Sequence, residues 1–188
     1  LDQCLFSGTN FLTAILIGRI AGDAELGVYA LCFSLTMISI ATQRALLVSP
    51  FVVVSAKLDS SQSREMHGSM LITTLLLAGS LALLATIAFA FASPIVAIAV
   101  MVAMPAGLFR DFHRRLAIAR MQLVSAFLFD LVVAVCQIGL LAYLAWTENL
   151  TATSALFGCS FVWIVSSVIT FLLTRDTSRF VISRMKQN

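Results

Sequence analysis

Long apolar runs separated by short polar breaks make up most of the chain. A helix that crosses the hydrocarbon core of a bilayer needs about 20 mostly apolar residues. Six runs reach roughly this length, at residues 4–21, 26–55, 69–92, 94–118, 122–146 and 152–174. None alternates between apolar and polar positions as a half-buried strand does. The pattern therefore predicts an all-α fold, a polytopic transmembrane bundle of about six helices.

The breaks between the runs supply the helix ends. The break at Ser93–Pro94 predicts a helix start, because proline at the first helical position loses no internal hydrogen bond. We expect residues 1–174 to form one transmembrane lobe. The basic segment 175–188 is then a cytoplasmic tail or a linker to a second lobe.

The composition also indicates a membrane protein. Hydrophobic residues make up 60% of the 188 residues and charged residues only 11%, and the mean hydropathy is +1.01. A soluble domain is about 45–50% apolar and about 25% charged, so a water-soluble fold would have no place for so much apolar surface. The net charge of +3 is too small to indicate nucleic acid as a partner.

The basic residues collect at alternate breaks. Ten of the twelve Lys and Arg residues follow or end the second, fourth and sixth runs, whereas Arg19 ends the first run and Arg44 lies inside the second. Cytoplasmic loops carry an excess of Lys and Arg. This bias predicts that both termini are cytoplasmic, with membrane lipids around the bundle.

Polar and small residues recur at helical spacing within four of the runs. They are Gln3, Ser7, Asn10, Ala14 and Gly18; Tyr29, Cys32, Thr36, Ser39 and Gln43; Asp130 and Gln137; and Ser160, Trp163, Ser167, Thr170 and Thr174. Such stripes let helices approach closely and hydrogen-bond to each other, or they line a central water-filled cavity. We expect packing for the serine, threonine and glycine positions. Both interpretations stay open for Asn10, Gln43 and Gln137.

Arg44 lies late in the long second run. A helix over 26–55 would be about 45 Å long, and a bilayer core is about 30 Å thick. Arg44 therefore either faces a polar cavity or extends to the cytoplasmic interface, and Pro50 indicates a bend nearby. In both positions it can attract an anion.

Asp130 lies well inside the fifth run, where a lone carboxylate needs a partner or a role in transport. One prediction is an Arg44–Asp130 ion pair within the cytoplasmic half of the bundle. The alternative is a carboxylate that couples transport to a proton or cation.

The segment RDFHRRLAIAR is a basic helix end. Asp111 is placed to pair with Arg114 or Arg115, three and four residues further along the helix. The usual role of such a segment is to anchor the protein to anionic lipid headgroups at the membrane interface. The candidates for this contact are Arg110, Arg114, Arg115 and Arg120.

The sequence contains no recognisable catalytic or metal-binding pattern. There is no Ser/His/Asp arrangement, no glycine-rich phosphate loop and no acidic metal cluster, and the four cysteines lie far apart within apolar runs. We therefore expect no enzymatic activity and no cofactor.

Several positions in the first two runs match a family pattern. They are Asp2, Gln3, Ser7, Gly8, Asn10, Phe11, Arg19, Gly27 and the segment QRAL at 43–46. In these positions the chain resembles polysaccharide exporters of the multidrug/oligosaccharidyl-lipid/polysaccharide (MOP) exporter superfamily. Residues 110–130 are similar to the family's basic link between helices four and five, which often ends in an acidic residue.

The resemblance implies a transporter with two similar lobes around a central cavity, working by alternating access in the bacterial inner membrane. Its substrate would be a lipid-linked polysaccharide precursor, such as an undecaprenyl-pyrophosphate-linked oligosaccharide. Arg44 is the first candidate to engage the pyrophosphate and Arg19 the second. The remaining candidates for the cavity come from the polar stripes and are Gln3, Asn10, Gln43 and Gln137.

Family members have twelve to fourteen helices, whereas this sequence predicts about six, so a second lobe or a homodimer partner would have to close the cavity. Two other functions stay open. A drug/cation antiporter of the same superfamily would use Asp130 as its coupling carboxylate. A non-transporting membrane subunit or a truncated remnant would need none of the polar residues.

Overall fold

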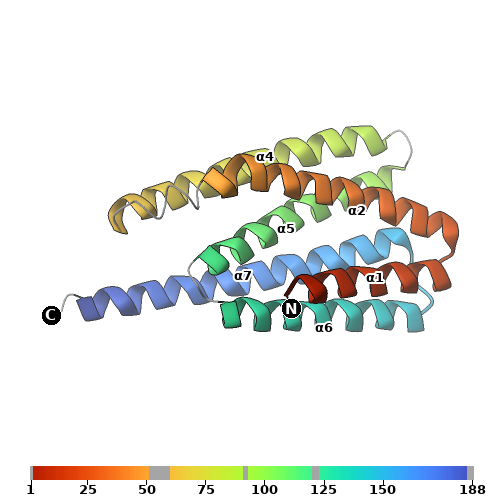
Figure 1. The fold of residues 1–188 in the computed structure, drawn as a ribbon. Helices are drawn as coiled ribbons and strands as arrows, with labels where there is room; N and C mark the ends of the chain where they lie inside the picture. Colours follow the sequence, from red (N-terminus) through yellow and green to blue (C-terminus); the bar gives the residue numbers. More distant parts are fainter. Residues whose placement is uncertain (1, 51–59, 91–92, 120–122, 186–188) are drawn as a thin grey trace.

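The computed structural model describes residues 2–50, 60–90, 93–119 and 123–185, which form a bundle of helices (Figure 1). In chain order the elements are α1 (Asp2–Ile20), α2 (Asp23–Gln43), the π-helical turn η1 (Arg44–Val48), α4 (Ser60–Ala90), α5 (Pro94–Ala119), α6 (Leu123–Trp146) and α7 (Ala152–Met185). The predicted all-α fold is confirmed. The predicted helix start at Pro94 is also confirmed.

Five of the described helices are long and apolar enough to cross a membrane, and the apolar part of α1, Cys4–Ile20, is somewhat shorter. Large apolar side chains cover the outside of the bundle: Leu31, Leu84 and Phe161 are 64%, 65% and 65% exposed. A water-soluble protein rarely leaves so much apolar surface open. The chain is therefore a multi-pass membrane protein.

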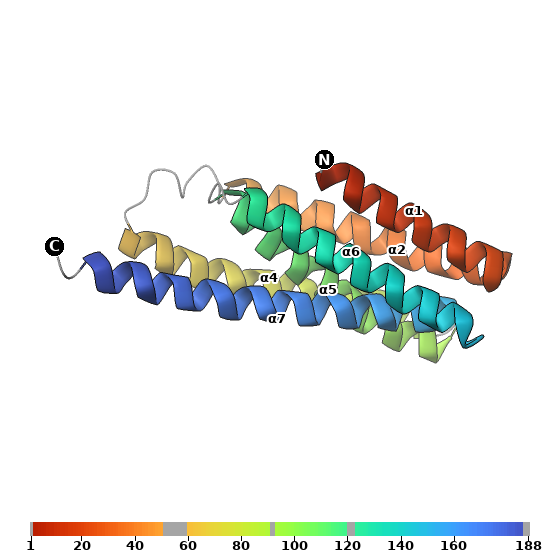
Figure 2. The same ribbon diagram turned by 90° about the horizontal axis from the view of Figure 1, so that it is seen from below.

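Successive helices run in opposite directions along the bundle. The α1–α2 and α6–α7 links, the end of α4 and the start of α5 lie at one end, whereas the start of α6 and the end of α7 lie at the other (Figures 1 and 2). The α1–α2 link is short because Gly22 adopts a φ of 91°, which favours glycine. The basic residues follow every second apolar run, and this spacing predicts the same alternation of helix directions. Below, the basic end means the end at which α5 finishes.

α5 is the central helix, since it packs against α2, α4, α6 and α7. Its apolar segment is 67% buried, more than that of any other described span. Small side chains make this close packing possible. They include Ala99, Ala103 and Ala106, all buried, and Gly107, where an added methyl group would lie 3.1 Å from Thr36 Cγ2 and 3.2 Å from Trp163 Cζ3.

The polar stripe predicted in the second run is confirmed as a buried face of α2. All five of its members, from Tyr29 to Gln43, are buried. In α1 the predicted stripe is confirmed only in part: Ser7 is exposed and Asn10 is half-buried, whereas the fully buried positions are Thr13 and Ile17. The Thr13 hydroxyl donates to the carbonyl of Thr9 in the same helix. Because its polar group has this partner, Thr13 can pack inside the bundle.

The end of α2 departs from a regular helix. η1 is one wider turn, in which the Ser49 N–H donates to the carbonyl of Arg44, five residues earlier. Pro50 follows directly; proline has no N–H and crowds the carbonyl four residues before it. Prolines and π-helical turns are both common causes of an irregular helix. The predicted helix to residue 55 cannot be compared further, since 51–59 lie outside the described residues, whereas α7 continues past the predicted end at 174 to Met185.

Candidate anion-binding site

Two ion-paired groups lie in the basic half of the bundle. The first joins α2 to α5 through Arg44 and Asp111. Arg44 donates from Nε to Oδ2 at 2.9 Å and from Nη2 to Oδ1 at 2.6 Å, a two-point contact that fixes the plane of the guanidinium. Asp111 is only 7% exposed, whereas the arginine side chain is 36% exposed.

The second group joins α5 to α6 through Asp130. Arg110 Nη2 donates to its Oδ1 at 2.9 Å, and Arg114 Nε lies 2.6 Å from its Oδ2. All three side chains are at least nine-tenths buried. The predicted Arg44–Asp130 ion pair is therefore wrong. Asp130 points to α5, which lies between α2 and α6 in the packing, and the two arginines of α5 take both of its oxygens.

Asp111 also links the two groups along α5. Arg114 Nη1 lies 3.9 Å from its Oδ1 and Arg115 Nε lies 3.6 Å from its Oδ2. These are the pairings that the helical spacing predicts, and both are confirmed. We call the whole set the arginine–aspartate cluster. It consists of Arg44, Arg110, Asp111, Arg114, Arg115 and Asp130.

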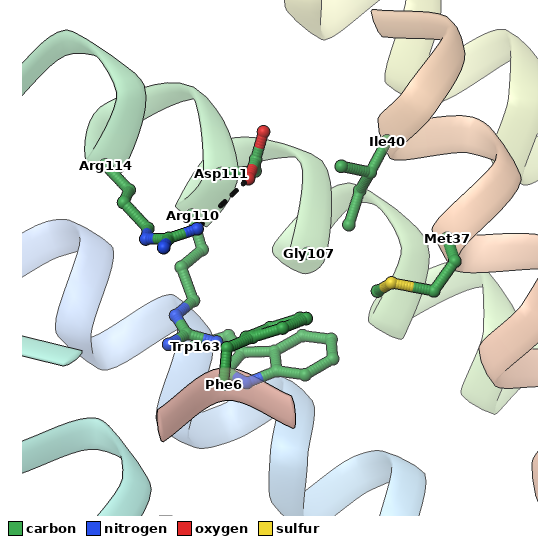
Figure 3. A pocket seen from close by; sticks show the side chains of 8 residues that line it. All are labelled: Phe6, Met37, Ile40, Gly107, Arg110, Asp111, Arg114 and Trp163. Carbon is green, nitrogen blue, oxygen red and sulfur yellow. Dashed lines mark ion pairs between the residues drawn. The ribbon is translucent and has the colours of Figure 1, made fainter. Parts of the chain in front are cut away.

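Aromatic rings of two other helices hold Arg110 in place. Its guanidinium carbon lies 5.8 Å from the ring centroid of Phe6 on α1 and 5.9 Å from that of Trp163 on α7. Figure 3 shows Arg110 extending towards these two rings and Arg114 extending towards Asp111. A ring face attracts a cation at this distance. Arg110 is thus solvated by protein groups instead of water.

A chain of hydrogen bonds fixes the indole in turn. Trp163 Nε1 donates to Gln137 Oε1 at 3.1 Å, and Gln137 Nε2 donates to Thr13 Oγ1 at 3.3 Å. These bonds connect α7, α6 and α1 inside the bundle. Both ends of the Gln137 amide group therefore have protein partners, as in a residue that packs helices together.

The predicted contact of the α5 arginines with lipid headgroups does not fit two of them. The side chains of Arg110 and Arg114 are 10% and 9% exposed and turn inward, because the buried carboxylates attract them. Arg115 is 36% exposed and is the described arginine of this segment that is open to its surroundings. Arg120 lies outside the described residues.

The cluster has more positive than negative charge. Among the described residues of the cluster, four arginines face two aspartates, an excess of two positive charges within this set. Charged side chains inside a membrane are costly unless they are paired or solvated. An anion with two negative charges, such as a phosphate group, would balance the cluster, and arginine binds carboxylate and phosphate with the same pair of donors.

The polar hollows beside the cluster are small. One, of about 20 Å³, is lined by Phe6, Gly107, Arg110, Asp111, Arg114 and Trp163 among others (Figure 3). A second, of about 10 Å³, includes Asn10, Asp130 and Gln137 in its wall. Each has room for about one water molecule. A larger hollow of about 430 Å³ lies between α6 and α7, but none of the residues that line it is charged.

The other candidate residues are dispersed. Gln43 is completely buried, and neither atom of its amide group has a partner among the described residues. Arg19 is exposed in the last turn of α1, at the end of the bundle away from the cluster. The side chain of Gln3 lies outside the described part of the chain.

Sequence reasoning missed two members of this region as functional candidates. No sequence pattern marks Phe6, and Trp163 belongs only to a predicted polar stripe, because neither carries a charge. For Asp111, helical spacing predicts only pairs within its own helix. A signal for its contact with Arg44 was available, since both residues lie in the basic half of the predicted topology.

Comparison of the chain with protein-family models, with curated proteins and with solved structures gives no match.

Proposed function

We propose that this chain is one lobe of an exporter that flips lipid-linked polysaccharide or oligosaccharide precursors across the cytoplasmic membrane, with both termini on the cytoplasmic side. The observation that carries the proposal is the excess of two positive charges in the arginine–aspartate cluster. Pyrophosphate-linked lipids carry their negative charge in the headgroup region, and basic pockets between transmembrane helices on the cytoplasmic side bind anionic headgroups.

Arg44 is the residue of the cluster best placed to meet such a substrate. Its Nε and Nη2 are held by Asp111, while Nη1 has no hydrogen-bond partner in the described part of the chain. The side chain is 36% exposed, so the guanidinium is both oriented and accessible. Alternating access requires a second lobe or a second copy of the chain to complete the cavity.

The direct test is Arg44→Ala in cells that depend on this gene. We expect surface polysaccharide to be lost while the amount of protein in the membrane is unchanged. Thr42→Ala is the matched control, because Thr42 lies two residues away and donates only to the carbonyl of Ile38 in its own helix. Normal surface polysaccharide in the Arg44→Ala strain would refute the proposal.

An antiporter that uses Asp130 as its coupling carboxylate receives less support from the geometry. Both of its oxygens contact arginine, so the charge of Asp130 is already balanced inside the bundle. A coupling carboxylate has to exchange its arginine partners for a proton or a cation during each transport cycle.

A further inference from the structure

Asp111 lies where three guanidinium groups converge. Arg44 reaches it from α2 with two hydrogen bonds, and Arg114 and Arg115 approach it from the next turn of α5, at 3.9 and 3.6 Å. Protein sites that bind phosphate often place several cationic side chains around its oxygen atoms, as these three arginines surround the carboxylate. Here a carboxylate of the chain itself fills the position.

The two aspartates of the cluster differ in how accessible their partners are. Two of the three arginines around Asp111, namely Arg44 and Arg115, are each 36% exposed. The arginines that hold Asp130 are 10% and 9% exposed. The side chains of Arg44 and Arg115 are therefore partly open to an anion from outside, whereas Arg114, which also holds Asp130, is enclosed.

We propose that Asp111 is an internal competitor that occupies a phosphate-binding site formed by Arg44 and Arg115. A phosphate or pyrophosphate group binds there by displacing the carboxylate from Arg44. This proposal rests on the proposed function and adds a regulatory element to it. The carboxylate keeps the affinity for a highly charged substrate low enough for release, which a transporter needs as much as binding.

The competition also ties ligand binding to the position of α2. The described contacts of Arg44 with Asp111 join α2 to α5 at the basic end. A ligand shifts a conformational equilibrium only when it interacts differently with the two states. An anion that replaces Asp111 at Arg44 breaks the link between the end of α2 and α5. The protein without the anion keeps this link, so the two states differ in how α2 is held. Arg44 begins the π-helical turn η1, a type of turn often found at functional sites.

The test compares two variants that each remove one buried negative charge, Asp111→Asn and Asp130→Asn. Both proteins and the wild type are purified in detergent, and the midpoint of thermal unfolding is followed as inorganic pyrophosphate is added, with sodium chloride at equal ionic strength as the reference. We expect Asp111→Asn to bind pyrophosphate about tenfold more tightly than the wild type, since a competing charge-assisted contact is gone. Asp130→Asn should show no such gain, because its arginines are enclosed.

A charge-balanced pair of variants covers the case in which Asp111→Asn does not fold. Asp111→Asn combined with Arg115→Gln keeps the net charge of the wild type, and Arg115→Gln alone is its reference. The double variant should bind pyrophosphate more tightly than the single one. Equal binding in this pair, or an equal gain in Asp111→Asn and Asp130→Asn, would overturn the proposal.

The outcome also separates this inference from the proposed function. If export depends on Arg44 but removal of the Asp111 carboxylate brings no gain in pyrophosphate binding, only the competitor is refuted. If export survives Arg44→Ala, the proposed function itself fails.

Discussion

At Gly107, α5 packs closely against Thr36 of α2 and Trp163 of α7, and replacing this glycine tests how tight the packing is. The added methyl group of Gly107→Ala would lie 3.1 Å from Thr36 Cγ2 and 3.2 Å from Trp163 Cζ3. Both distances are shorter than ordinary carbon–carbon contacts of about 3.5–4.0 Å. The indole has little freedom to retreat, because its Nε1 is hydrogen-bonded to Gln137.

Two effects of opposite sign decide the size of the change. Alanine favours a helix over glycine by about 1 kcal/mol, and overpacking a well-packed interior costs about 1–3 kcal/mol. Gly139→Ala on α6 provides the matched control, since its added methyl group meets no atom within 4 Å. We therefore expect Gly107→Ala to be less stable than Gly139→Ala by about 1–3 kcal/mol.

The assay is thermal unfolding of the purified proteins in detergent. For a chain of this length, 1 kcal/mol corresponds to a shift of about 2–4 °C in the unfolding midpoint. Gly107→Ala should therefore unfold about 2–12 °C below Gly139→Ala. Equal midpoints would mean that the three helices have room at this position, and the argument for a rigid support behind Arg110 would fall with it.

Two further predictions concern polar groups away from the ion pairs. Gln43→Leu removes two buried amide atoms that have no described partner and should raise the stability of the protein by about 1–3 kcal/mol. Gln137→Leu breaks two hydrogen bonds and should lower the stability. Unfolding midpoints that shift in the same direction for both variants would contradict this. Glu25 Oε2 accepts a hydrogen bond of 2.5 Å from the N–H of Ala152 at the start of α7. Glu25→Ala should therefore cost about 0.5–2 kcal/mol, while Glu25→Gln, which keeps an acceptor, should cost less in the same assay.

The number of helices and most of their bounds could be predicted, because lipid leaves few choices. Every backbone polar group in a bilayer core has to be paired, and a helix does this within one segment. Runs of apolar residues therefore mark helices directly, and a proline such as Pro94 marks where one begins. The π-helical turn could not be foreseen from the periodicity of apolar residues, since it changes the hydrogen bonding of a single turn before Pro50.

The ion pairs were only partly predictable, because some join residues of one helix and others join residues far apart along the chain. Contacts between Asp111 and Arg115 follow from helical spacing alone. The contacts Arg44–Asp111 and Arg110–Asp130 join different helices, and choosing among them requires the rotation of each helix about its axis. The partial match in α1, where Thr13 and not Ser7 faces inward, shows that stripes of small residues do not fix this rotation.

The two aspartates show how similar residue types acquire different roles through burial. Asp130 and its two arginines are enclosed on all described sides, so they join α5 to α6 as a permanent part of the bundle. Asp111 is also buried, but its closest partner, Arg44, is more than a third exposed and begins η1, directly after α2. Water or an anion can compete for the second contact and not for the first. The enclosed pairs of Asp130 thus join α5 to α6, and the partly exposed pair of Asp111 joins α5 to the end of α2.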